Sequence, residues 1–407
     1  MKLIDSLVKY NIQILWVIVI ILFCYLIFFS LKKLSIPSHG FATYYTASKL
    51  LIEGKSAANF YDDDWFSARV EEKVPGIYEV YLVNLPTTAL VLVPIAALEY
   101  STARSIWIIF NLIFLFVTAL IIIKQMKLNE VWLPLALLLI LLFQPLYANV
   151  SFGQIYIFIF CLLVFAWFAY KSGNEKLAGA LIGLVFILKT AALFIPILFM
   201  MKKKWKAFMW FVLTVLCLFI TTLPILGLDP WLAYLNKLMS YSSSPTLSVT
   251  AYQSVHSFFH HFFFFDEKWN LFPLADLPLL AKVLTILFSL IILLVTVIGA
   301  NKIKKPDPAF GIFLIISIIL SPASIDYHYV ILLIPILISF EWLKGSKSRL
   351  NWSLFIISFI LIAASIPYIS PKITKGLLAV FAYPKLYGAL GFLFLYLQAA
   401  YKKESYD

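Results

Sequence analysis

Residues 131–169 read VWLPLALLLILLFQPLYANVSFGQIYIFIFCLLVFAWFA, two long apolar runs joined by the short polar motif Ser151-Phe152-Gly153-Gln154. A second such motif, Ser321-Pro322-Ala323-Ser324-Ile325-Asp326-Tyr327-His328, stands between two further apolar runs. An unsatisfied polar group is costly in the bilayer core, so polar residues at such positions usually line a cavity or a site. The pattern predicts membrane helices with a functional site at their joints.

Composition places the whole chain in the membrane class. Hydrophobic residues make up 63% and charged residues 13% of the 407, and the mean hydropathy is +0.95. A soluble domain carries about 25% charged residues. The net charge of +12 resides in short lysine clusters between apolar runs, without the basic patch and interleaved aromatics of a nucleic-acid interface. Such clusters are typical of cytoplasmic loops, and anionic lipid headgroups are their expected partner.

The apolar runs predict an all-α, polytopic protein with about 11–13 membrane segments, because a segment needs roughly 20 residues unless it is a broken half-helix. We expect one membrane domain over residues 1–407. If the lysine-bearing joints are cytoplasmic, every polar motif falls on the opposite side. The run Leu82–Leu98 contains Pro86 and Pro94, and it either spans the membrane or enters and leaves on the outer side.

Two polar regions, 35–80 and 228–276, are expected outside. In the first, the aromatic and apolar residues of Phe41–Ile52 recur at helical spacing, which favours a helix on the membrane surface. An ordinary surface helix packed on the bundle is the alternative. The second region is long and aromatic, as expected for a lipid-tail groove or a headgroup-level anchor. We find no internal repeat, which argues against an inverted-repeat transporter.

A series of short motifs along the chain resembles the motifs of a known protein family. The motifs, in order, are Gly40-Phe41-Ala42-Thr43-Tyr44-Tyr45-Thr46-Ala47-Ser48, Asn84-Leu85-Pro86, Gly153-Gln154, Lys189, Tyr252-Gln253-Ser254 and Ser321-Pro322 with Asp326-Tyr327-His328. Their order and spacing resemble glycosyltransferase family 87, the polyprenol-phosphate-mannose-type mannosyltransferases. The likeness extends over residues 36–343, and no single motif is decisive.

The resemblance implies a helical bundle of the GT-C type and a specific reaction. A sugar, mannose or another hexose or pentose, would pass from a polyprenyl-phosphate carrier to a lipid-linked or polysaccharide acceptor. Transfer would invert the anomeric carbon in a single displacement, without a cofactor, on the outer face of a bacterial cytoplasmic membrane. The alternative is a non-catalytic relative, or a transporter or flippase of lipid-linked sugars.

The general base is open at this point. The resemblance implies an Asp at the position of Gly40, preceded here by His39. Either His39 takes the acceptor proton, or an acid from Glu53 or from the Asp62–Asp64 trio does, or the protein does not catalyse the usual reaction. Three adjacent acids are also typical of a solvated turn or a helix N-cap. No second ligand cluster accompanies them, so we expect no metal.

For the leaving phosphate, Lys189 is the first candidate, since it interrupts the apolar run Leu181–Met201 and an isolated lysine at membrane depth is usually functional. A lysine extending to the interface is the alternative. The resemblance implies that His328 contacts the donor phosphate or supports the base. A core histidine bonded to Asp326 is compatible with that role, and we count Asp326 among the binding candidates.

The remaining binding candidates are polar residues at helix starts and in the external segments. Gln154 and Gln253 can bind sugar hydroxyls or phosphate oxygens, although helix capping also explains them. His256 and His260 share a helical face, but without the acid or cysteine of a zinc motif we interpret His256 as a headgroup or phosphate contact. Tyr44 and Tyr45 complete the set.

Overall fold

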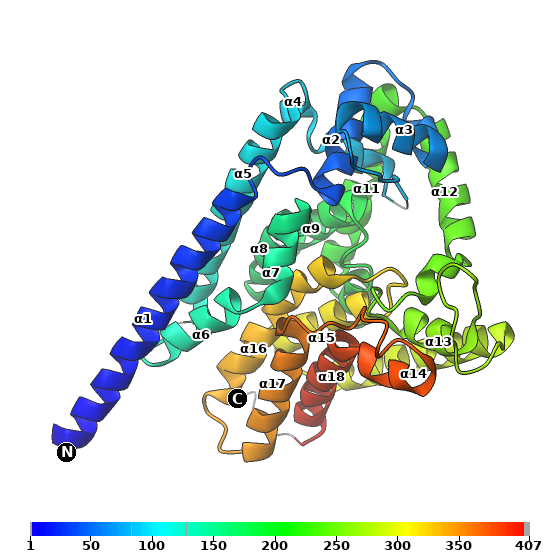
Figure 1. The fold of residues 1–407 in the computed structure, drawn as a ribbon. Helices are drawn as coiled ribbons and strands as arrows, with labels where there is room; N and C mark the ends of the chain where they lie inside the picture. The colour runs from blue at the N-terminus through cyan, green and yellow to red at the C-terminus, as the bar shows by residue number, and fades with distance from the viewer. Residues whose placement is uncertain (1, 83, 127, 403–407) are drawn as a thin grey trace.

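The computed structural model describes residues 2–82, 84–126 and 128–402, and its elements are helices connected by loops (Figure 1). The described residues contain no strand, and an isolated bridge joins Asp266 to Asn270. The all-α polytopic fold that the sequence predicts is therefore confirmed.

Fewer helices reach full spanning length than we expected. Five described helices are long and apolar enough to cross a membrane, or up to seven if each of two bent pairs counts as one span. The expected runs are present, but several are too short to cover the roughly 20 residues of a span. The five are α1 (Lys2–Lys32, apolar from Ile12), α5 (Tyr100–Met126), α11 (Trp205–Leu226), α14 (Pro278–Lys302) and the continuous stretch of η4 (Asp326–Leu332) and α16 (Leu333–Leu343).

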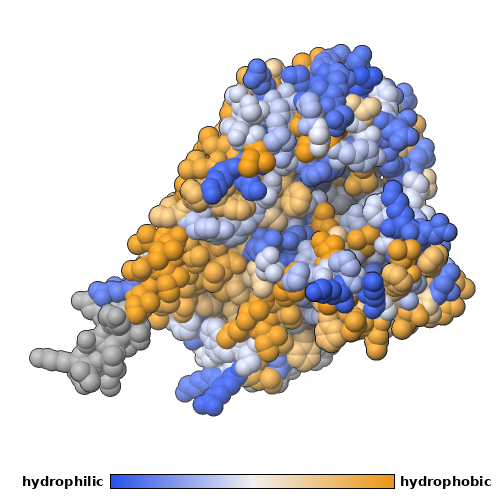
Figure 2. Space-filling model, viewed as in Figure 1, coloured by the Kyte–Doolittle hydropathy of each residue, from blue (hydrophilic) through white to orange (hydrophobic). Residues whose placement is uncertain are grey.

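The bent pairs and the shorter apolar helices complete the bundle. In one pair α6 and α7 meet at 42°, and in the other η5 and α18 meet at 57°. Figure 2 shows apolar residues covering the face along α1, while hydrophilic residues gather over the end formed by α2 and α3. The bounds are α6 (Trp132–Leu141), α7 (Gln144–Phe152), η5 (Gly376–Ala382), α18 (Pro384–Lys402), α8 (Tyr156–Lys171), α9 (Glu175–Leu188), α10 (Ile195–Met201), α15 (Pro306–Ile319) and α17 (Arg349–Ala363).

The segments that we expected outside form short helices. These are α2 (His39–Ile52), η1 (Ala57–Tyr61), α3 (Asp63–Lys73), η2 (Pro86–Leu90), α4 (Val93–Ala96), α12 (Asp229–Tyr241), η3 (Pro245–Ser248) and α13 (Val255–Phe263). Neither η2 nor α4 is long enough to cross a membrane, which removes the spanning alternative for this run. The helix α2 is buried from Gly40 to Ser48 rather than lying on the surface, because its tyrosines reach partners on several elements.

A buried arginine fixes the start of α2 against the end of α7. The guanidinium of Arg104, on α5, donates to the Lys33 and Ser151 carbonyl oxygens at 3.0 Å each and to the Ser38 hydroxyl. Gly153 ends α7 in the left-handed region, at φ +66°, and a Cβ there would lie 2.6 Å from the Arg104 Nη1 atom. Only glycine adopts this conformation freely in so small a space.

We expect Arg104→Met to lower the thermal stability of the purified protein. The substitution leaves several buried acceptors without donors, and each one costs roughly 1–3 kcal/mol. The measurement is the unfolding temperature in detergent, with Arg69→Met, on the exposed surface of α3, as the control. Equal unfolding temperatures for the two variants would contradict the assigned role.

Candidate active site

A cavity of about 530 Å³ brings together residues from seven segments that are far apart in the chain. These segments are the joints that the sequence places opposite the lysine clusters, so the polar motifs converge in space. The lining residues come from 39–44, 79–85, 152–156, 189–190, 241–252, 321–328 and 368–369. Six of the twelve candidate residues line this cavity: His39, Tyr44, Gln154, Lys189, Asp326 and His328.

The helix α2 forms one wall through a tight contact with the start of α8. The Tyr44 hydroxyl donates to Gln154 Oε1 at 2.6 Å, and both residues are buried. A Cβ placed on Gly40 would overlap Gln154 Nε2 and lie 2.8 Å from the Phe152 carbonyl oxygen. The absence of a side chain at position 40 is therefore what allows α2 to pack this closely on Gln154.

Lys189 lies at the break between α9 and α10, as the interrupted apolar run suggests. Its ammonium donates to Asn84 Oδ1 and lies 5.3 Å from the centre of the Tyr44 ring and 5.9 Å from that of Tyr156. No carboxylate in the described part of the chain forms an ion pair with it. Burial lowers the pKa of Lys189 to about 7, and an anion bound beside the ammonium would favour its charged form.

His328 is fixed by the backbone and by aromatic rings rather than by Asp326. The Ile325 N–H donates to His328 Nδ1 at 3.1 Å, so the proton of the neutral ring is on Nε2. The Tyr156 ring centre lies 4.4 Å from the imidazole. The ring also interacts with the Ala323 carbonyl oxygen, so a phosphate or sugar oxygen would share the remaining N–H with that carbonyl.

Asp326 is instead paired with a lysine that the sequence did not single out. Lys385, on α18, is 1% exposed and lies 2.9 Å from Asp326 Oδ1. Its ammonium also donates to the Ile362 carbonyl oxygen at 2.6 Å. This pair ties the C-terminal helix to the cavity wall. The isolated lysine just after Pro384 is the signal that could have found it.

Glu79 is a second acid that lines the cavity, besides Asp326, and our sequence reasoning missed it. The carboxylate lies in the loop between α3 and η2, with Oε1 3.0 Å from His39 Nδ1 and Oε2 3.5 Å from the Thr43 hydroxyl. Burial raises the pKa of Glu79, and the contact with His39 partly opposes that rise. The signal in the sequence is that Glu79 stands alone among apolar and aromatic neighbours in Ile77-Tyr78-Glu79-Val80-Tyr81.

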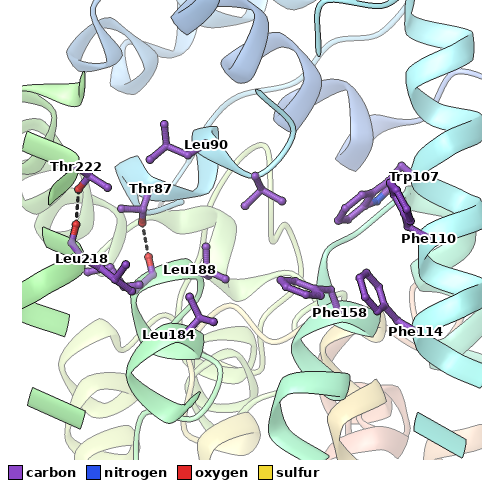
Figure 3. Close-up of a pocket in the computed structure, with 12 residues that line it drawn as sticks. Thr87, Leu90, Trp107, Phe110, Phe114, Phe158, Leu184, Leu188, Leu218 and Thr222 are labelled. Carbon is purple, nitrogen blue, oxygen red and sulfur yellow. Dashed lines mark hydrogen bonds between the residues drawn. The ribbon is translucent and has the colours of Figure 1, made fainter. Parts of the chain in front are cut away.

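A second, apolar cavity of about 420 Å³ adjoins the first (Figure 3). Leu184 and Leu188 of α9, Leu218 of α11, and Trp107 and aromatic residues of α5 and α8 point into it. The two cavities are separated by short stretches, since 84–85 and 189 line the polar one and 87 and 187–188 line the apolar one. The hydroxyl of Thr87 donates to the Ile187 carbonyl oxygen across this boundary.

The family model for glycosyltransferase family 87 matches residues 83–323, more than half of the chain. The chain belongs to glycosyltransferase family 87. This membership makes it a membrane glycosyltransferase. No match was found among curated proteins or among solved structures. The matched residues include Asn84, Gln154 and Lys189 of the cavity, whereas His39, Glu79 and His328 lie outside them.

Three acidic candidates of this family 87 protein do not reach the cavity. Asp62 caps α3 and accepts a hydrogen bond from the Trp65 N–H at 3.0 Å. It therefore has the helix N-cap role that the sequence allowed as an alternative to a base. Asp63 lies 2.6 Å from the Lys237 ammonium, and Glu53 lies 2.8 Å from that of Lys73. Each acid therefore has a local partner that holds it outside the cavity lining.

Three binding candidates are likewise used elsewhere. The Tyr45 hydroxyl donates to the Leu98 carbonyl oxygen at 2.9 Å. Gln253 is fully buried and donates to the Thr250 and Ala382 carbonyl oxygens. These bonds satisfy the polar groups inside the protein, as buried groups require.

The third of these candidates, His256, lies on α13 and stacks on His260, with ring centres 3.8 Å apart. Burial lowers the pKa of His256 to about 3, so the ring is neutral at ordinary pH. The described residues contain no group of three or more His, Cys, Asp or Glu that could hold a metal ion. That transfer proceeds without a metal remains a prediction.

Proposed function

We propose that this family 87 protein transfers a sugar from a polyprenyl-phosphate carrier to a lipid-linked or polysaccharide acceptor. The observation that carries the proposal is that a polar cavity, in which Lys189 has no carboxylate partner among the described residues, lies beside an apolar cavity. A polyprenyl-phosphate sugar offers one part to each of these features: a sugar for the polar cavity, a phosphate for the lysine and a long apolar chain for the apolar cavity. The sugar, mannose or another hexose or pentose, would occupy the polar cavity.

Lys189 is the phosphate-binding residue in this proposal. Of the described residues that line the polar cavity, Lys189 is the one lysine or arginine. The ammonium and the His328 imidazole border the same space, and both can donate to phosphate oxygens. As the anomeric C–O bond breaks, negative charge builds on the leaving phosphate, and a fixed cation there stabilises the transition state.

The apolar cavity supports a lipid donor rather than a nucleotide sugar. Its wall is formed by leucines and aromatic rings of α5, α8, α9 and α11, and α5 and α11 are two of the long apolar helices. Burying an isoprenoid chain there is favourable by about 25 cal/mol for each Å² removed from water. A nucleotide offers no comparable apolar surface to these residues.

The same arrangement supports a proposal for the side of the membrane and for the acceptor. The cavity opens among the joints opposite the lysine clusters, which by the positive-inside rule is the non-cytoplasmic side. In a bacterial cytoplasmic membrane this is the outer face, where lipid-linked glycans and envelope polysaccharides are found. The acceptor hydroxyl attacks the anomeric carbon in a single inverting displacement, and polyprenyl phosphate leaves.

We expect Leu184→Trp to raise the KM for long-chain polyprenyl-phosphate donors about tenfold, equivalent to about 1.4 kcal/mol. The indole fills part of the apolar cavity, so the chain loses contacts. A soluble donor with a short chain should be unaffected. The measurement compares both donors in liposomes, with Leu213→Trp, at an exposed position of α11, as the control. An equal loss with the short-chain donor would contradict the chain-binding role.

A further inference from the structure

The acids in and near the polar cavity differ in the partners that their carboxylates contact. Asp326 faces the fully buried Lys385 at 2.9 Å, in an ion pair whose disruption leaves an uncompensated buried charge. Glu53 and Asp63 are paired with lysines outside the cavity. Asp326 and Glu79 both line the cavity, but only Glu79 has no lysine partner among the described residues and instead contacts a histidine, His39.

Position 40 has no room for an acid. The space next to Gly40 is filled by the Gln154 amide and the Phe152 carbonyl oxygen. The Tyr44 hydroxyl holds that amide in place. An acid that serves the cavity must therefore come from another segment, and the loop between α3 and η2 supplies it.

We infer that Glu79 is the general base of the transfer reaction and that His39 positions its carboxylate. This inference rests on the proposed function, because it assigns a base to that reaction. The Glu79 side chain is 24% exposed, toward a cavity large enough for a sugar, and the His39 side chain is 53% exposed at the rim. A base needs this combination of access to the substrate and a fixed orientation.

The step balances with the groups in the cavity. The acceptor hydroxyl gives its proton to a Glu79 oxygen, and its oxygen pair forms the new bond to the anomeric carbon. The bond from that carbon to the phosphate oxygen breaks, and both of its electrons leave with polyprenyl phosphate beside Lys189. Glu79 then returns the proton to water through the cavity mouth.

The surroundings of Glu79 set the expected pH dependence. His39, Thr43 and Tyr44 lie near it on α2. Tyr252, in the loop after η3, and Tyr327, on η4, also lie close enough to interact with its charge. Burial raises the pKa of Glu79 and the His39 contact lowers it. A base acts when ionised, so kcat/KM should rise with pH through the pKa of Glu79, above the ordinary range of a glutamate.

The test replaces Glu79 by glutamine, which keeps the shape and removes the base. We expect kcat to fall at least about 100-fold, as for loss of a general base, while binding of a polyprenyl-phosphate sugar stays within twofold of wild type. Glu53→Gln, whose carboxylate lies outside the cavity, should remain within twofold in both. Glu79→Asp should regain part of the lost rate, which separates lost chemistry from misfolding.

Two outcomes distinguish this inference from the proposed function. Near wild-type turnover by a folded Glu79→Gln protein overturns the base assignment and leaves the transferase intact. If wild type neither binds nor consumes the donor, the proposed function fails first, and the base assignment with it. His39→Gln should shift the rising limb to higher pH, because the contact that lowers the pKa of Glu79 is removed. An unshifted limb would reduce His39 to a structural role.

Discussion

Replacing Lys189 with methionine is expected to lower kcat for sugar transfer by about 100- to 1,000-fold, the loss seen when one fixed donor to a developing negative charge is removed. Methionine keeps the unbranched shape against the rings of Tyr44 and Tyr156. The variant loses the ammonium and its bond to Asn84. The folded structure should survive, because the lysine has no ion-pair partner among the described residues whose charge would be left uncompensated.

The measurement is transfer from a labelled polyprenyl-phosphate sugar by the purified, reconstituted protein. Lys206→Met, on the exposed start of α11, is the matched control and should retain activity. Lys189→Arg keeps the charge but changes its geometry, so we expect intermediate activity. Equal turnover by Lys189→Met and Lys206→Met would show that Lys189 does not hold the leaving phosphate.

The second large effect concerns Gly40. The family resemblance implies an acid at this position, so Gly40→Asp could be expected to restore a base. The structure predicts the opposite result, because any Cβ there overlaps the Gln154 amide and crowds the Phe152 carbonyl oxygen. Overpacking of this kind costs typically 1–3 kcal/mol. We therefore expect Gly40→Asp to lower both the unfolding temperature and the rate of transfer.

Two further variants separate the steric effect from the charge. Gly40→Ala should lose stability without adding an acid, and Gln154→Ala in the same chain should relieve part of that loss. Gly345→Asp is the matched control, since a Cβ at Gly345 meets no atom within 4 Å. A Gly40→Asp protein that is stable and more active than wild type would contradict the packing that we describe and would move the base back to α2.

The bundle could be predicted from the sequence because apolar runs mark membrane helices directly. The expected break at Lys189 and the joint at Ser151–Gln154 are both present. The burial of α2 could not be predicted, since it depends on remote partners. The sequence alone suggests that Tyr44 and Tyr45 belong to an exposed aromatic face. In the structure their hydroxyls donate to Gln154 Oε1 and to the Leu98 carbonyl oxygen.

Among polar residues, isolation in apolar sequence was the useful signal and clustering was misleading. Lys189 and His328 interrupt apolar surroundings, and both line the cavity. The conspicuous acidic trio instead caps α3 and pairs with Lys237. Glu79 is also isolated among apolar and aromatic residues, but no motif around it indicates a function. Its contact with His39 is formed only in the folded chain. The pairing of Asp326 with Lys385 is likewise a contact between segments that the sequence does not connect.

The most direct test is consumption of a labelled polyprenyl-phosphate sugar by the reconstituted protein in the presence of lipid-linked acceptors extracted from bacterial membranes. A panel of hexose and pentose donors covers the choice of sugar. The account predicts that wild type releases polyprenyl phosphate from at least one donor, and that Lys189→Met and Glu79→Gln do not while Lys206→Met does. Failure of wild type to bind or consume every donor, with folded protein in the membrane, would contradict it.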